Sequence, residues 1–290
     1  MALSSLTVTR SLLVVGARGQ LGTALTQLSV DRNLDFRALN SSDLDLRDEA
    51  ATHKAVTGWG RSVRDSDGLV VINAASYNAV DDAERDIGTA HAINAMAPGT
   101  LAAACGQVGA RLVHVSTDYV FAGDANEPYD VDAPTAPLGA YGRTKRDGEQ
   151  VVREMLPEAS YVVRTAWLYG GVGHNFVKTI VRLEAERDTL RVVNDQTGSP
   201  TWSRDLADGL LVLALSDAPA GTYHATNGGD TTWHGLARAI FEELGADPER
   251  VQSTTSQAFT RLAPRPTYSV LSARAWKDAG LPRFGLGGKH

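Results

Sequence analysis

The run Ser11-Leu-Leu-Val-Val15 leads directly into a loop with glycine at every third position, Gly16-Ala-Arg-Gly19-Gln-Leu-Gly22. A short apolar segment that ends at glycine is typical of a strand buried on both faces of a parallel sheet. Glycine allows a sharp turn and a close approach to a pyrophosphate, and a helix N-terminus offers free N–H groups and a positive dipole end. The pattern predicts a dinucleotide-binding loop, with cofactor contacts at Gly16, Arg18, Gly19, Gln20, Leu21 and Gly22. The alternative is a tight strand-to-helix turn without a ligand, because the spacing is not the common G-x-G-x-x-G.

Apolar runs alternate with helical stretches along the chain. Strands are expected at 11–15, 35–39, 68–75, 111–117, 161–164, 190–194 and 222–225. Helices are expected at 19–30, 49–64, 82–105 (bent near Pro98), 175–186, 203–215 and 232–244. This alternation implies right-handed crossovers and predicts an α/β fold with a Rossmann-type, doubly wound parallel sheet. A chain of 290 residues has room for such a domain and a smaller second lobe.

Charge and cysteine content narrow the classes of partner and compartment. The formal net charge of -6 argues against nucleic acid as the main partner, because no basic stripe balances it. The single cysteine, Cys105, excludes a disulfide within the chain and fits a reducing cytosol. No apolar stretch approaches the roughly 20 residues that span a bilayer, and the polar start 1–10 is expected to be a frayed leader, not a secretory signal. We therefore expect a cytoplasmic protein that binds neither nucleic acid nor membrane.

The residues after the second expected strand bear on the choice of dinucleotide. NAD sites often place an acid there for the ribose 2′-hydroxyl, whereas this chain has Asn40-Ser-Ser42. Arg18 in the glycine loop could pair with a 2′-phosphate, so the sequence favours NADPH, with NADH as a further cofactor. Asp45, beside Leu46, could accept a hydrogen bond from the adenine amine. The alternative for Asp45 is a carboxylate at a helix N-terminus.

A tyrosine and a lysine four residues apart, Tyr141 and Lys145, would share one face of a helix. A free tyrosine has a pKa near ~10, and a nearby ammonium would lower that pKa. Reduction of a ketone needs such an acid, because the carbonyl oxygen gains negative charge as hydride arrives. Thr117, at the end of the fourth expected strand, could donate to the same oxygen, and Lys145 could also bind the nicotinamide ribose. The alternatives are an exposed helix pair and a simple strand-end cap.

In these motifs the chain resembles the dTDP-4-dehydrorhamnose reductase family of extended short-chain dehydrogenase/reductases. The segments that carry the resemblance are Asn73 to Glu84, Ser116 to Phe121, Arg164 to Tyr169, Asn175-Phe176, Asn194 to Pro200 and Arg265-Pro266. They occur in the order typical of the family, over about residues 11 to 285.

The resemblance implies hydride transfer from NAD(P)H to the C4 keto group of a dTDP-4-keto-6-deoxyhexose, most closely dTDP-4-dehydro-L-rhamnose. It implies a Rossmann domain at 1–165 and, at 166–290, mostly a C-terminal lobe for the sugar nucleotide, with some segments returning to the sheet. The implied catalytic residues are Thr117, Tyr141 and Lys145. The residues implied beside the cofactor are Asn73, Ala74, Ala75 and Val80, and those implied near the sugar nucleotide are Asp118, Tyr119, Trp167, Asn175 and Arg265. Trp167 as a core residue and Arg265 as a surface ion-pair residue remain alternatives.

Two features bear on metals and assembly. Some members of the resembled family dimerise around magnesium held by glutamates of the first helix and the extreme C-terminus. Here neither 20–28 nor 283–290 contains an acid, and the seven histidines show no ligand-like spacing. We therefore expect no metal site, and a monomer or a metal-independent dimer.

Four other functions stay open at this point. A 4-ketoreductase of another deoxysugar pathway and a nucleotide-sugar epimerase would use the same tyrosine and lysine. A nucleotide-sugar dehydratase would resemble the pattern Thr-Asp-Glu at this place, whereas here Asp118 is followed by Tyr119. A non-catalytic regulatory subunit would not need to keep Thr117, Tyr141 and Lys145 together. The exact sugar and the product stereochemistry are not determined by these residues.

Overall fold

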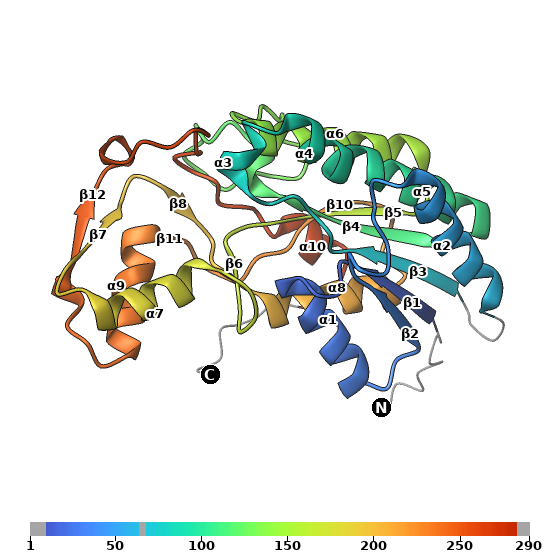
Figure 1. Cartoon of the computed structure of the whole chain (residues 1–290), viewed down its shortest axis with the longest axis horizontal. Helices are drawn as coiled ribbons and strands as arrows, with labels where there is room; N and C mark the ends of the chain where they lie inside the picture. The colour runs from blue at the N-terminus through green and yellow to red at the C-terminus, as the bar shows by residue number, and fades with distance from the viewer. Residues whose placement is uncertain (1–9, 64–67, 283–290) are drawn as a thin grey trace.

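A computed structural model describes residues 10–63 and 68–282 (Figure 1). Of the expected leader 1–10, residues 1–9 lie outside the described residues, whereas Arg10 is buried and begins the first strand, so the leader was predicted one residue too long. The end of the expected helix, at residue 64, and the acid-free segment 283–290 also lie outside the described residues. The larger lobe is built on a six-stranded sheet in which every pair of neighbouring strands is parallel. Its strands are β1 (Arg10–Val15), β2 (Phe36–Leu39), β3 (Gly68–Asn73), β4 (Arg111–Thr117), β5 (Ser160–Thr165) and β10 (Gly221–His224). This confirms the predicted Rossmann-type fold.

The order of the strands, β10-β5-β4-β3-β1-β2, places β1 between β2 and β3. The chain therefore leaves β1 toward one edge of the sheet and later returns to its other side, which creates a topological switch point. The register aligns the carboxyl ends of the strands, with Val15 opposite both Leu39 and Asn73, and Thr117 opposite Thr165. Ligands of open α/β sheets bind along this edge.

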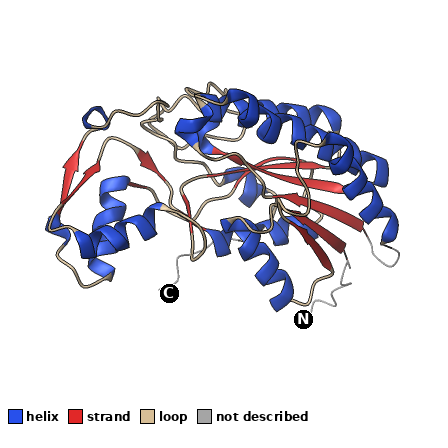
Figure 2. Cartoon of the chain, in the orientation of Figure 1, coloured by secondary structure: helices blue, strands red, loops and turns tan. Residues whose placement is uncertain are grey.

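Helices cover both faces of the sheet (Figures 1 and 2). One layer contains α2 (Glu49–Ser62), α5 (Ala97–Val108) and α6 (Ala140–Met155), and the other contains α1 (Gln20–Asp31), α8 (Ser203–Leu215) and α10 (Arg274–Asp278). The strands are apolar throughout because both faces are buried: Leu12 and Val14 pack on the α1/α8 side, and Leu13 and Val15 on the α2/α5 side.

The smaller lobe lies at the other end of the molecule (Figure 1). It contains α7 (Phe176–Glu186), α9 (Trp233–Glu243) and the parallel pair β7 (Leu190–Val193) and β12 (Val251–Thr254). Its own apolar core is centred on Ile180 and Phe241. Short pairs at its base are β6 (Leu168–Tyr169) with β9 (Thr201–Trp202) and β8 (Thr197–Gly198) with β11 (Thr231–Thr232), and 3-10 turns lie at Pro248–Arg250 and Ser256–Ala258.

The expectation of one helix over 82–105 is wrong. The segment contains α3 (Val80–Ala83), α4 (Ile87–His91), a π-helical turn (Ala92–Met96) and then α5. Asp86 interrupts the segment because its carboxylate caps α4 by accepting from the Thr89 N–H. Pro98 lies in the first turn of α5, where a missing N–H is tolerated, so it begins that helix after the π-turn and does not bend a longer one.

Candidate active site

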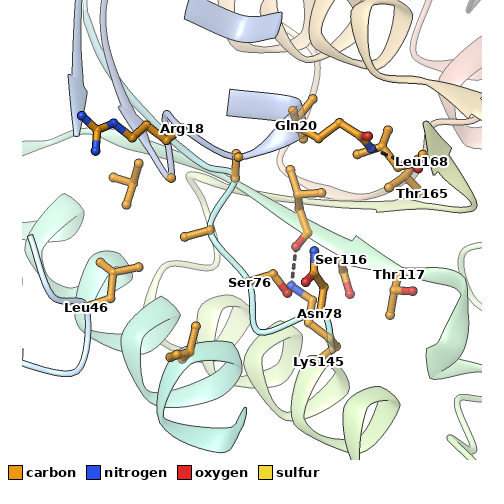
Figure 3. Close-up of a pocket in the computed structure, with 18 of the residues that line it drawn as sticks. Arg18, Gln20, Leu46, Ser76, Asn78, Ser116, Thr117, Lys145, Thr165 and Leu168 are labelled. Atoms are coloured by element: carbon orange, nitrogen blue, oxygen red, sulfur yellow. Dashed lines mark hydrogen bonds between the residues drawn. The ribbon is translucent and has the colours of Figure 1, made fainter. Parts of the chain in front are cut away.

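A cavity of about 660 Å³ runs along the carboxyl edge of the sheet (Figure 3). Its walls come from the glycine loop, the segment after β2, the segment after β3, the end of β4, the start of α6 and residues 165–168, which begin at the last residue of β5. Arg18 lies at one end of the view, and Thr117 and Lys145 lie toward the other. Of the residues predicted for the cofactor, the structure places in these walls Gly16, Arg18, Gly19, Gln20, Leu21, Asp45, Leu46, Ala74, Ala75, Tyr141 and Lys145.

The glycine loop has the tight geometry that its sequence predicts. Gly16 has a φ of +84°, and a Cβ on it would lie 2.6 Å from the Ala75 N atom. A Cβ on Gly22 would lie 2.1 Å from the Gly16 carbonyl oxygen, so only glycine lets α1 pack this closely on the loop. Gly19 is the N-cap of α1 and forms no side-chain cap bond, which leaves the first turn of α1 as a cavity wall with N–H groups for an anion.

The segment after β2 brings polar groups to the Arg18 end of the cavity. Arg18 Nη1 lies 3.4 Å from the Ser42 Oγ, and within residues 10–63 and 68–282 no carboxylate pairs with the Arg18 guanidinium. Asp45 accepts from Arg47 through both oxygens, Oδ1 from Nε at 2.9 Å and Oδ2 from Nη2 at 2.7 Å. These bonds lower the Asp45 pKa to about 2, so this carboxyl is ionised at neutral pH.

Tyr141 and Lys145 share one face of α6, as their spacing predicts. The N-terminus of α6 is held by Glu84, whose Oε1 accepts from the Ala140 N–H at 2.6 Å. A Cβ on Gly142 would lie 2.2 Å from the Tyr119 carbonyl oxygen, so glycine lets α6 approach the turn after β4 closely. The result is that the phenol, the ammonium and Thr117 line one cavity.

Burial controls the protonation of this group more than the charges within it. Burial raises the pKa of Tyr141 to about 12, while the Thr117 and Ser76 hydroxyls lower it by hydrogen bonding. The expected lowering of this pKa by Lys145 is therefore wrong: the Lys145 Nζ donates to the Val115 carbonyl oxygen at 2.6 Å, and burial itself lowers the pKa of Lys145 to about 8.

Behind Lys145 lies a buried ion pair that the sequence did not reveal. Glu149, one further turn along α6, accepts from Arg164 of β5 at 2.9 and 2.7 Å and from the Ser116 hydroxyl at 2.5 Å. Both charged side chains are at most 2% exposed. Glu149 raises the Lys145 pKa and so partly opposes the effect of burial.

Asn94 is another residue that sequence reasoning missed. It lies in the π-helical turn, where its Oδ1 accepts from the Ser76 Oγ at 3.1 Å and its Nδ2 donates to the Thr144 Oγ1 at 3.1 Å. It thereby ties the segment after β3 to the helix that carries Tyr141. A lone asparagine in an alanine-rich stretch gives no sequence signal for such a role.

A second cavity, of about 790 Å³, lies between the C-terminal segment (residues 256–267) and the smaller lobe. Tyr119 and Arg265 belong to it, whereas Asp118 and Trp167 belong to the first cavity. The rings of Tyr119 and Tyr141 meet edge to face at 5.8 Å, so the two cavities adjoin at the phenol of Tyr141. Arg191 and Arg261 are further cations of the second cavity, and neither was predicted.

Arg265 is 12% exposed and forms a two-bonded ion pair with Asp81 of α3, at 2.8 and 2.7 Å. The Asp81 pKa is lowered to about 2, with the Arg265 hydrogen bond as the largest cause. Since Asp81 Oδ1 also accepts from the Ala263 N–H, one carboxylate ties the C-terminal segment to the larger lobe.

Trp167 is half-buried in the cavity wall, not in the core. It has a φ of 46°, a left-handed conformation that is uncommon outside glycine. Its ring stacks on Trp233 of α9, with centroids 3.5 Å apart, and Gly198 leaves room for it, since a Cβ there would lie 2.5 Å from the indole. This stack lies between the two cavities, because Trp167 lines the first and Trp233 the second.

The remaining predicted residues do not line either cavity in the described part of the chain. Asn73 is fully buried beside His114, Val80 begins α3, and Gly22 packs on the glycine loop. Asn175 caps α7 by accepting from the Lys178 N–H, and its Nδ2 donates to the Gln20 Oε1 at 2.8 Å. Asn175 therefore links the smaller lobe to the first turn of α1.

Comparisons with known proteins show the family of the chain. The profile of the family described as RmlD substrate binding domain matches residues 10–284. A dTDP-4-dehydrorhamnose reductase of Streptomyces griseus is 50% identical over 273 residues, covering 93% of this chain and 88% of the relative. A probable dTDP-4,6-dihydroxy-2-methyloxan-3-one 4-ketoreductase of Streptomyces antibioticus is 46% identical, covering 93% and 89%.

A solved structure extends the likeness to three dimensions. The dTDP-4-dehydrorhamnose reductase of Bacillus anthracis, crystallised in complex with NADP, superposes with a TM-score of 0.88 at 35% identity, covering 95% of this chain and 94% of that one. Sequence and structure are thus alike over nearly the whole described chain. The chain belongs to the dTDP-4-dehydrorhamnose reductase family.

Proposed function

We propose that the protein is an NADPH-dependent reductase that delivers hydride to the C4 keto group of dTDP-4-dehydro-L-rhamnose and forms dTDP-L-rhamnose. The observation that carries the proposal is one shared cavity for the glycine loop and for Thr117, Tyr141 and Lys145. A phenol that can give up a proton therefore lies where the reactive end of a dinucleotide would reach. An epimerase or a binding subunit would not account equally well for the relatives that are reductases by name.

The cofactor pocket fits a dinucleotide phosphate by its own chemistry. The close approach at Gly16 and the open first turn of α1 suit the pyrophosphate. Arg18, which has the Ser42 hydroxyl but no carboxylate beside it in the described part of the chain, suits a 2′-phosphate. NADPH, when bound, would supply the hydride. The related Bacillus anthracis structure, which contains NADP, supports this choice.

Tyr141, Thr117 and Lys145 would act on the ketone. Tyr141 is protonated throughout the neutral range because its pKa is about 12, so it can give its proton to the carbonyl oxygen as negative charge develops there. Thr117 would donate a hydrogen bond to the same oxygen. The Lys145 ammonium would hold the ribose beside the reacting atoms.

The sugar nucleotide would occupy the second cavity. Arg191, Arg261 and Arg265 are guanidinium groups of the kind that bind diphosphates. Tyr119 lies close to both Arg265 and Tyr141. Asp118 and Trp167 would contact the sugar from the first cavity.

We therefore propose residues 1–165 as the dinucleotide domain and 166–290 as mostly the substrate lobe, with α8, β10 and α10 packed on the large sheet. A single buried cysteine, Cys105, suits a reducing environment. We therefore propose the cytoplasm as the compartment.

A 4-ketoreductase of another deoxysugar is the second candidate, because the Streptomyces antibioticus relative is almost as similar as the first. The deciding experiment is NMR of the product formed from dTDP-4-dehydro-L-rhamnose and NADPH, with NADPH consumption followed in parallel. We expect one NADPH consumed per dTDP-L-rhamnose. A product epimeric at C4 would assign the chain to the other candidate, and sugar conversion without net NADPH consumption would contradict reduction.

A further inference from the structure

Asp118 is a buried carboxyl that the hydroxyls of Thr117 and Ser269 approach. Its side chain is 2% exposed and lines the first cavity. The Thr117 Oγ1 donates to Oδ1 at 3.0 Å, whereas Oδ2 has no hydrogen-bond partner among residues 10–63 and 68–282. A buried carboxylate oxygen without a partner is costly, and proteins keep such atoms where they carry a proton or meet a ligand.

Burial makes Asp118 easier to protonate than an exposed aspartate. Burial raises the Asp118 pKa to about 6, although the Ser269 and Thr117 hydroxyls favour the carboxylate. The groups that face it are the phenols of Tyr119 and Tyr141, which carry no charge at neutral pH. The nearest cations are engaged elsewhere: Lys145 of α6 donates to Val115, and Arg265 of the C-terminal segment is bound to Asp81.

Thr117 connects this carboxyl to the phenol. Its hydroxyl lies at hydrogen-bond distance from Asp118 Oδ1 and hydrogen-bonds to Tyr141. Once Tyr141 has given its proton to a ketone, a buried phenolate remains, and burial makes that charge unfavourable. A proton source within one hydroxyl of the phenol is therefore placed where the reaction needs it.

We propose that Asp118 restores the Tyr141 phenol after each turnover by sending a proton through the Thr117 hydroxyl. This inference rests on the reduction proposed above and adds the return path of the proton to it. In the reduction, the carbonyl carbon gains hydride and the carbonyl oxygen gains the Tyr141 proton. The phenolate then takes the Thr117 hydroxyl proton, and Thr117 takes the carboxyl proton of Asp118, which ends as carboxylate. A hydronium ion or a buffer acid from solvent returns a proton to the Asp118 carboxylate before the next cycle, and none of the three residues changes oxidation state.

The test is Asp118→Asn followed by stopped-flow measurement of NADPH oxidation. The amide has nearly the shape of the carboxyl but holds no transferable acid proton. Because Tyr141 starts protonated, we expect the first turnover at the wild-type rate, as a burst of one NADPH per site. Later turnovers should be about 10²-fold slower, within the usual contribution of a general acid. A small buffer acid such as acetic acid should partly restore them. The matched control Asp208→Asn, on the exposed surface of α8, should show no burst.

Two results would overturn the relay. One is a first turnover slowed as much as later ones, or a raised KM alone, since either would make Asp118 a substrate contact only. The other is a steady-state rate of Asp118→Asn equal to that of the wild-type protein. If wild-type protein shows no first turnover at all, the proposed function fails and not the relay.

Ser269→Ala provides a second measurement that does not remove the carboxyl. Loss of the hydroxyl that favours the carboxylate should raise the Asp118 pKa. Asp118 can donate only while protonated, so the steady-state rate should fall as pH rises through its pKa. The alkaline limb of kcat should then move to higher pH in this variant, and an unchanged limb would contradict the relay.

Discussion

At the scale of single residues, burial determines what the reactive groups can do. It raises the Tyr141 pKa and lowers the Lys145 pKa, because desolvation disfavours the charged form of each. Tyr141 is thus a neutral acid over the whole range in which the protein would work, and Lys145 is a cation only below a pH of about 8. These opposite shifts support the proposal that Tyr141 donates the proton and Lys145 binds the cofactor.

Tyr141→Phe should keep cofactor binding and lose most turnover, by about 10²- to 10⁴-fold, because only the acid proton is removed. NADPH affinity by fluorescence titration and single-turnover NADPH oxidation measure the two effects separately. Tyr161→Phe is the matched control, since that hydroxyl donates to the Ala218 carbonyl oxygen in the core. Single-turnover rates that are alike in both variants would exclude Tyr141 as the proton donor.

The affinity for NADPH should fall as pH rises through about 8 in the wild type. The sign follows from the lowered Lys145 pKa: the ammonium is present below that pH and is lost above it. Lys145→Met should bind NADPH more weakly and without this pH dependence, as measured by titrations from pH 6 to 10. A variant that keeps the alkaline decline would show that another group causes it.

Arg18→Ala should lower the affinity for NADPH by about 10- to 100-fold and the affinity for NADH much less, because only the 2′-phosphate offers Arg18 a dianion. Equilibrium titration with both cofactors checks this. Arg37→Ala, an exposed arginine of β2, is the matched control and should leave the ratio of the two affinities unchanged. Equal losses for both cofactors in Arg18→Ala would contradict the assignment.

At the scale of elements, α1 and α6 matter through how closely they approach neighbouring backbone. Gly22→Ala would place a Cβ 2.1 Å from the Gly16 carbonyl oxygen and 2.7 Å from the Ala17 Cα, and these backbone atoms leave little room to relax. We expect about 1–3 kcal/mol lower unfolding free energy and impaired cofactor binding. Gly58→Ala, in α2, meets no atom within 4 Å and should instead stabilise by up to about 1 kcal/mol. Urea denaturation compares them, and equal effects would refute the steric argument.

At the scale of the whole molecule, two polar links join the lobes around the cavities. Gln20 bonds to Asn175 on one side, and Asp81 holds Arg265 on the other. The Asp81 pKa, lowered to about 2, means that its carboxylate persists as pH falls well below neutral. The second link therefore stays intact between pH 5 and 8 and is lost only as pH falls toward that pKa.

Asp81→Asn should raise the KM for the sugar nucleotide several-fold and leave NADPH affinity nearly unchanged, because Arg265 would lose the partner that orients it in the second cavity. Steady-state kinetics with each substrate varied in turn measures the two effects. The exposed acid Asp82 of the same helix supplies the control, Asp82→Asn, which should behave as wild type. A change confined to NADPH affinity would be inconsistent with this placement.

The oligomeric state is a prediction from the sequence and has not been tested. A monomer or a dimer that does not require metal should sediment identically with EDTA and with added magnesium. A shift in sedimentation on adding magnesium would show that acids elsewhere on the surface hold the ion.

Local patterns were enough to predict most of the large lobe. The strand 111–117 and the helix 203–215 occur with the predicted bounds, and the glycine loop joins β1 to α1 as expected. Side-chain periodicity and turn chemistry depend on neighbours in the chain, so they can be read from the sequence alone. The spacing of Tyr141 and Lys145 also belongs to this class, because it requires only a helix.

Only the tertiary structure decided how the two cavities are built and how their groups titrate. Asn94 acts through partners 18 and 50 residues away in the chain. The Trp167–Trp233 stack and the Asp81–Arg265 pair likewise join residues far apart in sequence. The Tyr141 pKa moved opposite to the sequence-based prediction, because spacing along a helix reveals a nearby ammonium but not the extent of desolvation. Desolvation depends on every element packed around the phenol, and no local pattern in the chain encodes it.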